Sequence, residues 1–185
     1  MAHGMQVLAD AEQLWAGALG QVRADVLDDS SGCADWTNRD LINHVAGGGH
    51  RYSMLLTGAS AEDTAATRNS DYVGTDPVAE FWRYENLFVS VARSANLDLL
   101  VDHRAGRRTG RELLTMRVMD LTLHTHDLCC GIDVAWEPPE RVTKYLLTDA
   151  AAVIEELRGL GLFGAACTPR SASSTDRLLA FAGRS

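Results

Sequence analysis

The sequence predicts an all-α protein built as a bundle of amphipathic helices. Apolar residues recur every three or four positions along several long segments, which is the spacing of one helix face. Hydrophobic residues make up 46% of the 185 residues, which is enough to form a core. Because neither an internal repeat nor a linker interrupts the chain, we expect one domain over residues 1–185.

The first two predicted helices lie on either side of a polar turn. Residues 5–27 carry the helical repeat of apolar side chains, and the polar run 28–32 ends it. Thr37 and Asp40 match an N-cap followed by an acidic third helical position, so a second helix is expected from Thr37 to about Gly58. Residues 47–49 of this helix are all glycine, which costs helix stability and indicates close packing or an approach to the backbone.

A loop, a third helix and a polar turn are expected next. Residues 59–75 are small and polar with little periodicity, which predicts a loop. Asp76 and Pro77 are a typical helix start, and the apolar pattern continues to about residue 94. Residues 97–101 are predicted to be extended, and residues 102–110 to form an Arg-rich turn.

The fourth helix is predicted at residues 110–130 and is apolar on most sides, so we expect it at the centre of the bundle with Gly131 as its C-cap. Pro138 and Pro139 open a fifth, extra helix that ends near Gly159. The rest of the chain reads as a loop until a short closing element at residues 176–181.

Composition excludes several classes of protein. The formal net charge is −8, whereas a protein that binds nucleic acid needs a basic face for phosphate contacts. The sequence contains no apolar run long enough for a membrane span and no N-terminal signal peptide, so we expect a cytoplasmic protein. The four cysteines have neither CxxC redox spacing nor a zinc-ribbon pattern and are predicted to be free thiols.

The strongest chemical pattern combines the fourth helix with the second. Asp120 and His124 are four residues apart and project from one face, and Asp127 follows on roughly the same side. His44 lies near the apolar side of the second helix. A helix bundle can hold a metal in its core with such side chains, and two imidazoles with one carboxylate leave positions open for water or substrate.

Each of these residues also has a simpler interpretation. Asp120 and His124 can form a plain hydrogen-bonded pair, and His44 can be a core histidine. Asp127 can hold His124 in its metal-binding tautomer or accept a hydrogen bond at the helix end. The basic run within the polar turn can be a solvated loop or a site for an anionic group, and it comprises Arg104, Arg107, Arg108 and Arg111.

Three segments resemble one known family. Residues 33–45 (CADWTNRDLINHV), 120–128 (DLTLHTHDL) and 177–184 (RLLAFAGR) are similar, in this order, to segments of DinB-like metal-binding proteins. These proteins are relatives of the N-terminal domain of mycothiol-dependent maleylpyruvate isomerase. The resemblance extends from Trp15 to Arg184.

The resemblance implies a DinB-like four-helix bundle with a divalent metal between its helices. It places His44 and His124 at the two ligand histidines, and Asp120 at a position usually held by an acidic residue or His. Asp is one methylene shorter than the Glu common in the family, and His126 stands where Trp is common. The characterised isomerases have an additional C-terminal domain for which 185 residues leave no room, so maleylpyruvate itself is not the expected substrate.

Three functions are compatible with this sequence. In the first, His44, Asp120 and His124 bind a divalent metal, expected to be zinc, and Asp127 orients His124. Mycothiol, the thiol that the resemblance implies, attacks a small electrophile at this site. Nickel, iron or manganese also suit these ligands. The second is a metal-dependent hydrolase that uses bound water, and the third is a binding module for a metal or small ligand without turnover. We expect no nucleic-acid or membrane partner, and either a monomer or a homodimer.

Overall fold

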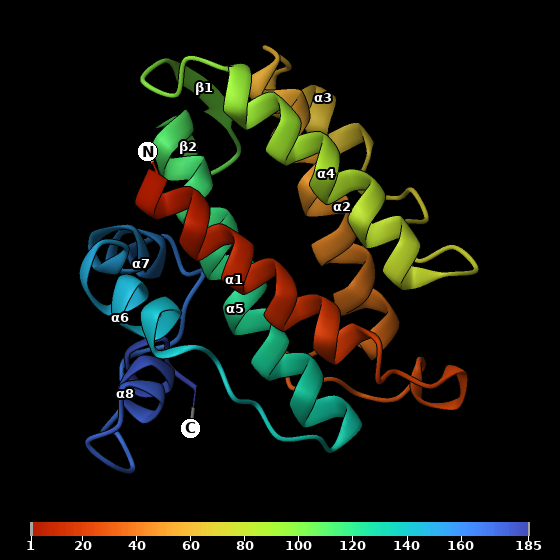
Figure 1. The fold of residues 1–185 in the computed structure, drawn as a ribbon, viewed down its shortest axis with the longest axis vertical. Coiled ribbons are helices and arrows are strands. Elements are labelled where there is room, and N and C mark those ends of the chain that lie inside the picture. Colours follow the sequence, from red (N-terminus) through yellow and green to blue (C-terminus); the bar gives the residue numbers. More distant parts are fainter. Residues whose placement is uncertain (1, 185) are drawn as a thin grey trace.

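The computed structural model describes residues 2–184. Its core is a four-helix bundle in which α1 lies beside α5 and α2 lies beside α4 (Figure 1). The α2 and α5 helices are also in contact, and this contact places the predicted metal ligands side by side. The all-α prediction is confirmed, with α1 at Ala2–Leu19, α2 at Asn38–Leu56, α4 at Pro77–Ser94 and α5 at Gly110–Ile132.

Three of the bundle helices, α2, α4 and α5, begin where the sequence predicts, and two of these starts match a predicted cap. Thr37 accepts a hydrogen bond from the backbone N–H of Asp40, and the Asp40 side chain accepts one from the backbone of Thr37, which forms a capping box. Asp76 caps α4 through the N–H of Ala79, and Pro77 stands at the first helical position. Local chemistry therefore fixes these starts without help from tertiary packing.

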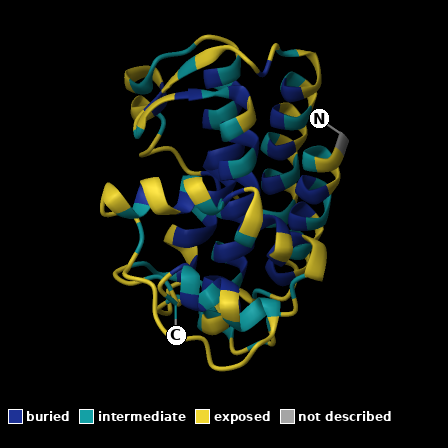
Figure 2. Cartoon of the chain, turned by 90° about the vertical axis from the view of Figure 1, so that its left-hand side faces the viewer, coloured by how far each residue is buried: buried dark blue, intermediate teal, exposed yellow. Residues whose placement is uncertain are grey.

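Buried residues concentrate along the bundle axis, and the exposed residues lie on its outer surface (Figure 2). The α5 helix is buried on most of its surface, as its apolar composition predicts, and contributes Leu113, Leu121 and Leu128 to the core with no measurable exposure. This burial also forces the buried polar residues of α5 to find partners inside the protein, because an unpaired buried polar group is costly. No helix within residues 2–184 is long and apolar enough to span a membrane.

The first helix and the first loop differ from the prediction. The α1 helix ends at Leu19 rather than residue 27, and after a turn Arg23 adopts an extended conformation before the 3-10 helix Ala24–Val26. The predicted loop at residues 59–75 contains a short helix, α3 (Ala61–Ala66), whose capping box is formed by Ser60 and Asp63. The six-residue length of α3 gives too little periodicity to detect.

A β-hairpin replaces the predicted polar turn. Strand β1 (Leu100–His103) pairs antiparallel with β2 (Gly106–Thr109), and His103 lies opposite Gly106. Gly106 has a positive φ of 96°, which a hairpin turn favours and other residues rarely adopt. The extended prediction for residues 97–101 was therefore partly right, and the turn prediction missed the second strand.

The C-terminal third also departs from the prediction in detail. The predicted fifth helix is two helices, α6 (Glu140–Thr148) and α7 (Ala151–Gly159). At the break between them, the hydroxyl of Thr148 donates a hydrogen bond to the backbone carbonyl of Lys144. The closing element is confirmed as α8 (Ser174–Phe181). Asp133, in the left-handed conformation, is the C-cap of α5 instead of Gly131.

Candidate metal centre

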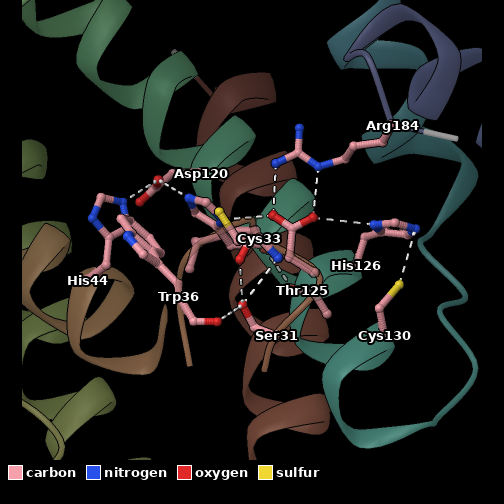
Figure 3. Close-up of polar contacts among 12 residues, drawn as sticks. Ser31, Cys33, Trp36, His44, Asp120, Thr125, His126, Cys130 and Arg184 are labelled. Carbon is pink, nitrogen blue, oxygen red and sulfur yellow. Dashed lines mark hydrogen bonds and ion pairs between the residues drawn. The ribbon is translucent and has the colours of Figure 1, made fainter. Parts of the chain in front are cut away.

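Two neighbouring helices bring the three predicted ligands together. His44 comes from α2, and Asp120 and His124 lie one turn apart on α5. The Oδ1 atom of Asp120 lies 3.2 Å from Nε2 of His44 and 3.4 Å from Nε2 of His124 (Figure 3). All three ligand atoms lie within 4.8 Å of one another. Zinc bonds of 2.0–2.1 Å in a tetrahedron would separate neighbouring ligand atoms by about 3.3 Å, so the donor set fits such an ion.

Trp36 covers the imidazoles of this cluster. Its ring centroid lies 4.8 Å from that of His44 and 5.9 Å from that of His124. Trp36 precedes the N-cap of α2, so the capping box that starts the helix also places the indole over the site. The indole restricts the rotation of both histidine rings and excludes water from one side of them.

Asp127 fixes the orientation of His124. One turn along α5, its Oδ2 atom lies 2.9 Å from Nδ1 of His124. Arg184, near the end of the chain, donates two hydrogen bonds of 2.8 Å to the same carboxylate (Figure 3). Burial alone would raise the pKa of Asp127, but the bonds from Arg184, His124 and His126 hold it well below its usual range. Asp127 is therefore an ionised acceptor.

The chemistry of His124 favours a cation between the ligands. An ionised carboxylate only accepts, so Asp127 keeps the proton of His124 on Nδ1. In the neutral ring, Nε2 then carries a lone pair that faces Oδ1 of Asp120 at 3.4 Å. Two acceptors at this distance repel each other unless a proton or a metal ion lies between them. The residues present thus fit a divalent metal, and a carboxylate behind a ligand histidine is typical of metal sites.

The surroundings of the cluster favour a neutral His44 and an ionised Asp120, the forms in which these side chains bind a metal. Burial lowers the pKa of His44, which favours the neutral imidazole that binds metals. Burial would raise the pKa of Asp120, but the charges and hydrogen bonds of His44, together with His124 and Arg117, keep it below its usual range. The Asp120 carboxylate is therefore ionised in the folded protein at neutral pH.

The cluster opens onto a cavity of about 310 Å³. Three arginines line it without an ion-pair partner within residues 2–184: Arg51 from α2, Arg68 after α3, and Arg104 in the hairpin turn. Burial and the neighbouring Arg68 lower the pKa of Arg51, and burial and Arg104 lower that of Arg68. The cavity therefore presents positive charge beside the cluster, although the whole chain is acidic.

The sequence matches the mycothiol maleylpyruvate isomerase N-terminal domain family over residues 8–129, which is more than half of the chain. The chain belongs to this family. The match includes two of the three resembling segments, residues 33–45 and 120–128, and with them the His44, Asp120 and His124 positions. The third segment, residues 177–184, lies outside the match.

Known proteins resemble the chain over most of its length. Two uncharacterized proteins of Mycobacterium tuberculosis, from two strains, are each 28% identical over 177 residues, which cover 94% of this chain and 93% of theirs. The crystal structure of the mycothiol-dependent maleylpyruvate isomerase superposes with a TM-score of 0.61 and 18% identity, covering 82% of this chain and 69% of that one. A histidine-to-alanine mutant of that enzyme gives a TM-score of 0.63 and 19% identity over the same shares. At these identities, the superpositions establish a shared fold.

The basic residues that the sequence suggested for anion binding do not lie together in the structure. Arg104 lines the cavity, but neither Arg107 nor Arg108 does. Arg108 is buried and donates two bonds of 2.7 Å to the Glu156 carboxylate, so its charge is already compensated. Arg107 and Arg111 are exposed, and Arg111 pairs with Asp98.

Cys33 belongs to a second group of metal-compatible atoms, with His124 and Asp127. Asp127 is an unsuitable ligand because both of its oxygens already accept hydrogen bonds from Arg184 and His124. Burial and the charge of Asp127 raise the pKa of Cys33, which favours the protonated thiol. The His44–Asp120–His124 group is therefore the better metal site, and Cys33 lines the cavity as an uncharged thiol.

Sequence reasoning missed several residues of the site. Arg51 and Arg68 carry no motif, so nothing in the sequence pointed to them. Arg184 ends the third family-like segment, but its contact with Asp127, 57 positions away, could not be predicted. Arg117 was detectable, because it precedes Asp120 by three helical positions, a spacing that pairs opposite charges. His126 lies outside the ligand group and contacts Trp136 and Cys130.

Proposed function

We propose that this protein binds a divalent metal through His44, Asp120 and His124 and catalyses thiol-dependent S-transfer or isomerisation of a small electrophile. The observation that carries the proposal is the ligand group itself, which opens onto a cavity of about 310 Å³ instead of being closed by a fourth side chain. An open coordination position is typical of catalytic metal sites. Family membership supports mycothiol as the thiol.

The metal and the protein would have separate tasks. A bound divalent cation such as zinc would supply positive charge that lowers the pKa of a thiol in the cavity. Asp127 holds His124 in the tautomer that leaves Nε2 free, and Trp36 shields the imidazoles from water.

The arginines favour an anionic electrophile. Arg51, Arg68 and Arg104 line the same cavity as the ligands, and a carboxylate or phosphate bound there would compensate their charge. Of the cluster Arg104, Arg107 and Arg108 suggested by the sequence, Arg104 alone stands at the cavity, so the proposed anion site combines it with two residues from other elements.

Elemental analysis of protein purified without added metal tests the first half of the proposal. We expect one equivalent of metal in the wild type and none in a His124→Ala variant. His50→Ala is the matched control, because His50 is also on α2 but contacts Tyr72 outside the ligand group. A His124→Ala protein that folds and keeps stoichiometric metal would disprove the site.

Turnover assays test the second half. Metal-loaded protein is mixed with a small electrophile that carries a carboxylate, with and without a low-molecular-weight thiol. Thiol-dependent product supports the proposal, whereas equal turnover in water alone would establish the hydrolase alternative. Stoichiometric metal without turnover across a panel of such electrophiles would favour a binding module.

A further inference from the structure

A buried ion pair lies directly behind the Asp120 ligand. Arg117 on α5 and Glu85 on α4 both have side chains with 0% exposure. The guanidinium of Arg117 donates from Nε to Oε2 of Glu85 at 2.9 Å and from Nη1 to Oδ2 of Asp120 at 3.0 Å. Three of the four bundle helices thus meet at this point, since His44 reaches Asp120 from α2.

The two oxygens of Asp120 have different partners. Arg117 occupies Oδ2, and Oδ1 faces the two histidines. The positive charge of Arg117 alone would weaken the attraction between Asp120 and a cation. Because Glu85 compensates that charge, Asp120 keeps its negative charge available for a metal.

The run of three glycines in α2 leaves room for this pair. A Cβ atom on Gly48 would lie 2.6 Å from Nη1 of Arg117 and 3.3 Å from Oδ2 of Asp120. A Cβ on Gly49 would lie 3.0 Å from Oε2 of Glu85. The α2 helix continues through these glycines. Glycine lowers the stability of a helix, but here its lack of a side chain lets the charged side chains approach the backbone closely.

A further carboxyl group adjoins the pair. Glu12 on α1 is buried, and its burial and the neighbouring Glu85 raise its pKa to about 8. Oε1 of Glu12 and Oε1 of Glu85 both lack a hydrogen-bond partner within residues 2–184. A proton that stays on Glu12 makes this carboxyl group a hydrogen-bond donor to Glu85. Glu12 is then neutral, and the negative charge of Glu85 balances the positive charge of Arg117.

We propose that Arg117 is a positioning residue for the metal ligand Asp120 and that Glu85 holds Arg117 in place. This inference rests on the proposed metal site. The pair fixes Asp120 so that Oδ1 alone is presented to the ion, and glycine is required at position 48 because any side chain there would displace Arg117.

The test replaces both members of the pair, Glu85→Leu with Arg117→Leu. The exchange removes one positive and one negative charge together, so no unpaired charge of the pair is left behind and we expect this double variant to fold. Its unfolding free energy should be lower than that of the wild type, because Oδ2 of Asp120 and the carboxyl group of Glu12 each lose a partner. Its affinity for metal should fall about 10- to 100-fold, as is typical when the partner of a metal ligand is removed. Zn²⁺ affinity is measured by competition with a chelator, and the visible spectrum of Co²⁺-loaded protein reports the altered ligand geometry.

A Gly48→Ala variant tests the same contact without changing a charge. We expect weaker Zn²⁺ binding and a changed Co²⁺ spectrum, whereas the matched helix variant Gly17→Ala, whose Cβ would meet nothing within 4 Å, should match the wild type. Wild-type metal affinity in the folded double variant would overturn the positioning role and leave the metal site standing. A wild-type protein that binds no Zn²⁺ or Co²⁺ would refute both proposals.

Discussion

Replacing Asp127 with Asn probes the contact that joins the end of the chain to the candidate metal centre. The side chain keeps its shape but loses its charge. In the wild type, the carboxylate accepts two bonds of 2.8 Å from Arg184 and one of 2.9 Å from His124. The amide of Asn has one acceptor oxygen, so it cannot satisfy Arg184 on both sides and also hold His124.

The magnitude follows from burial. Breaking a buried ion pair from one side costs about 3–5 kcal/mol. The Asp127 side chain is 2% exposed and the Arg184 side chain is 20% exposed, so water reaches the arginine and we expect the lower end, about 3 kcal/mol. Metal affinity should fall about 10- to 100-fold in addition, because His124 is no longer held in one tautomer.

Two measurements separate these effects. Urea unfolding in the presence of a chelator gives the loss of stability without bound metal, and chelator competition gives the loss of metal affinity. Asp98→Asn is the matched control, since Asp98 also accepts two bonds from one arginine, Arg111, but lies exposed on the surface. Equal unfolding free energies and equal metal affinities for wild type and Asp127→Asn would show that the carboxylate performs neither task.

Three further outcomes are expected. Gly131→Ala should lower the unfolding free energy by about 1–3 kcal/mol in urea titrations, because its Cβ would lie 2.2 Å from Oδ1 of Asn38, whereas Gly17→Ala should not lower it. Burial and nearby arginines lower the pKa of His103 to about 4 from 6.5, so the unfolded chain takes up the proton first as pH falls. Stability should therefore drop by about 2 kcal/mol more between pH 7 and pH 5 in the wild type than in His103→Asn. Arg68→Gln should raise the KM for an anionic electrophile about tenfold at low salt, and an effect that persists unchanged at high salt would contradict electrostatic binding.

Much of the fold could be predicted because its signals are local. The start of α2 depends on the capping box of Thr37 and Asp40, and the start of α4 on Asp76 and Pro77, all within one helical turn. Local signals failed where tertiary contacts decide. The end of α5 moved to Asp133 because Gly131 lies against another element, where its small size is needed for packing instead of capping.

In the candidate site, too, local spacing was predictable, whereas the packing establishes the contacts between helices. Asp120, His124 and Asp127 could be predicted because helical geometry alone aligns residues four and three apart, and Arg117 belongs to the same stripe. The His44 contact could be expected, but the contact between α2 and α5 establishes it.

The sequence by itself determined the helical class, the family and the face of α5 that carries the candidate ligands. The tertiary structure decided which charges surround them. Arg184 reaches Asp127 across 57 positions, and Arg51 and Arg68 meet at the cavity while Arg108 is paired elsewhere. Helix periodicity acts over a few residues, whereas a charge finds its partner through space, so only the packed chain determines which arginines are compensated and which remain available for a ligand.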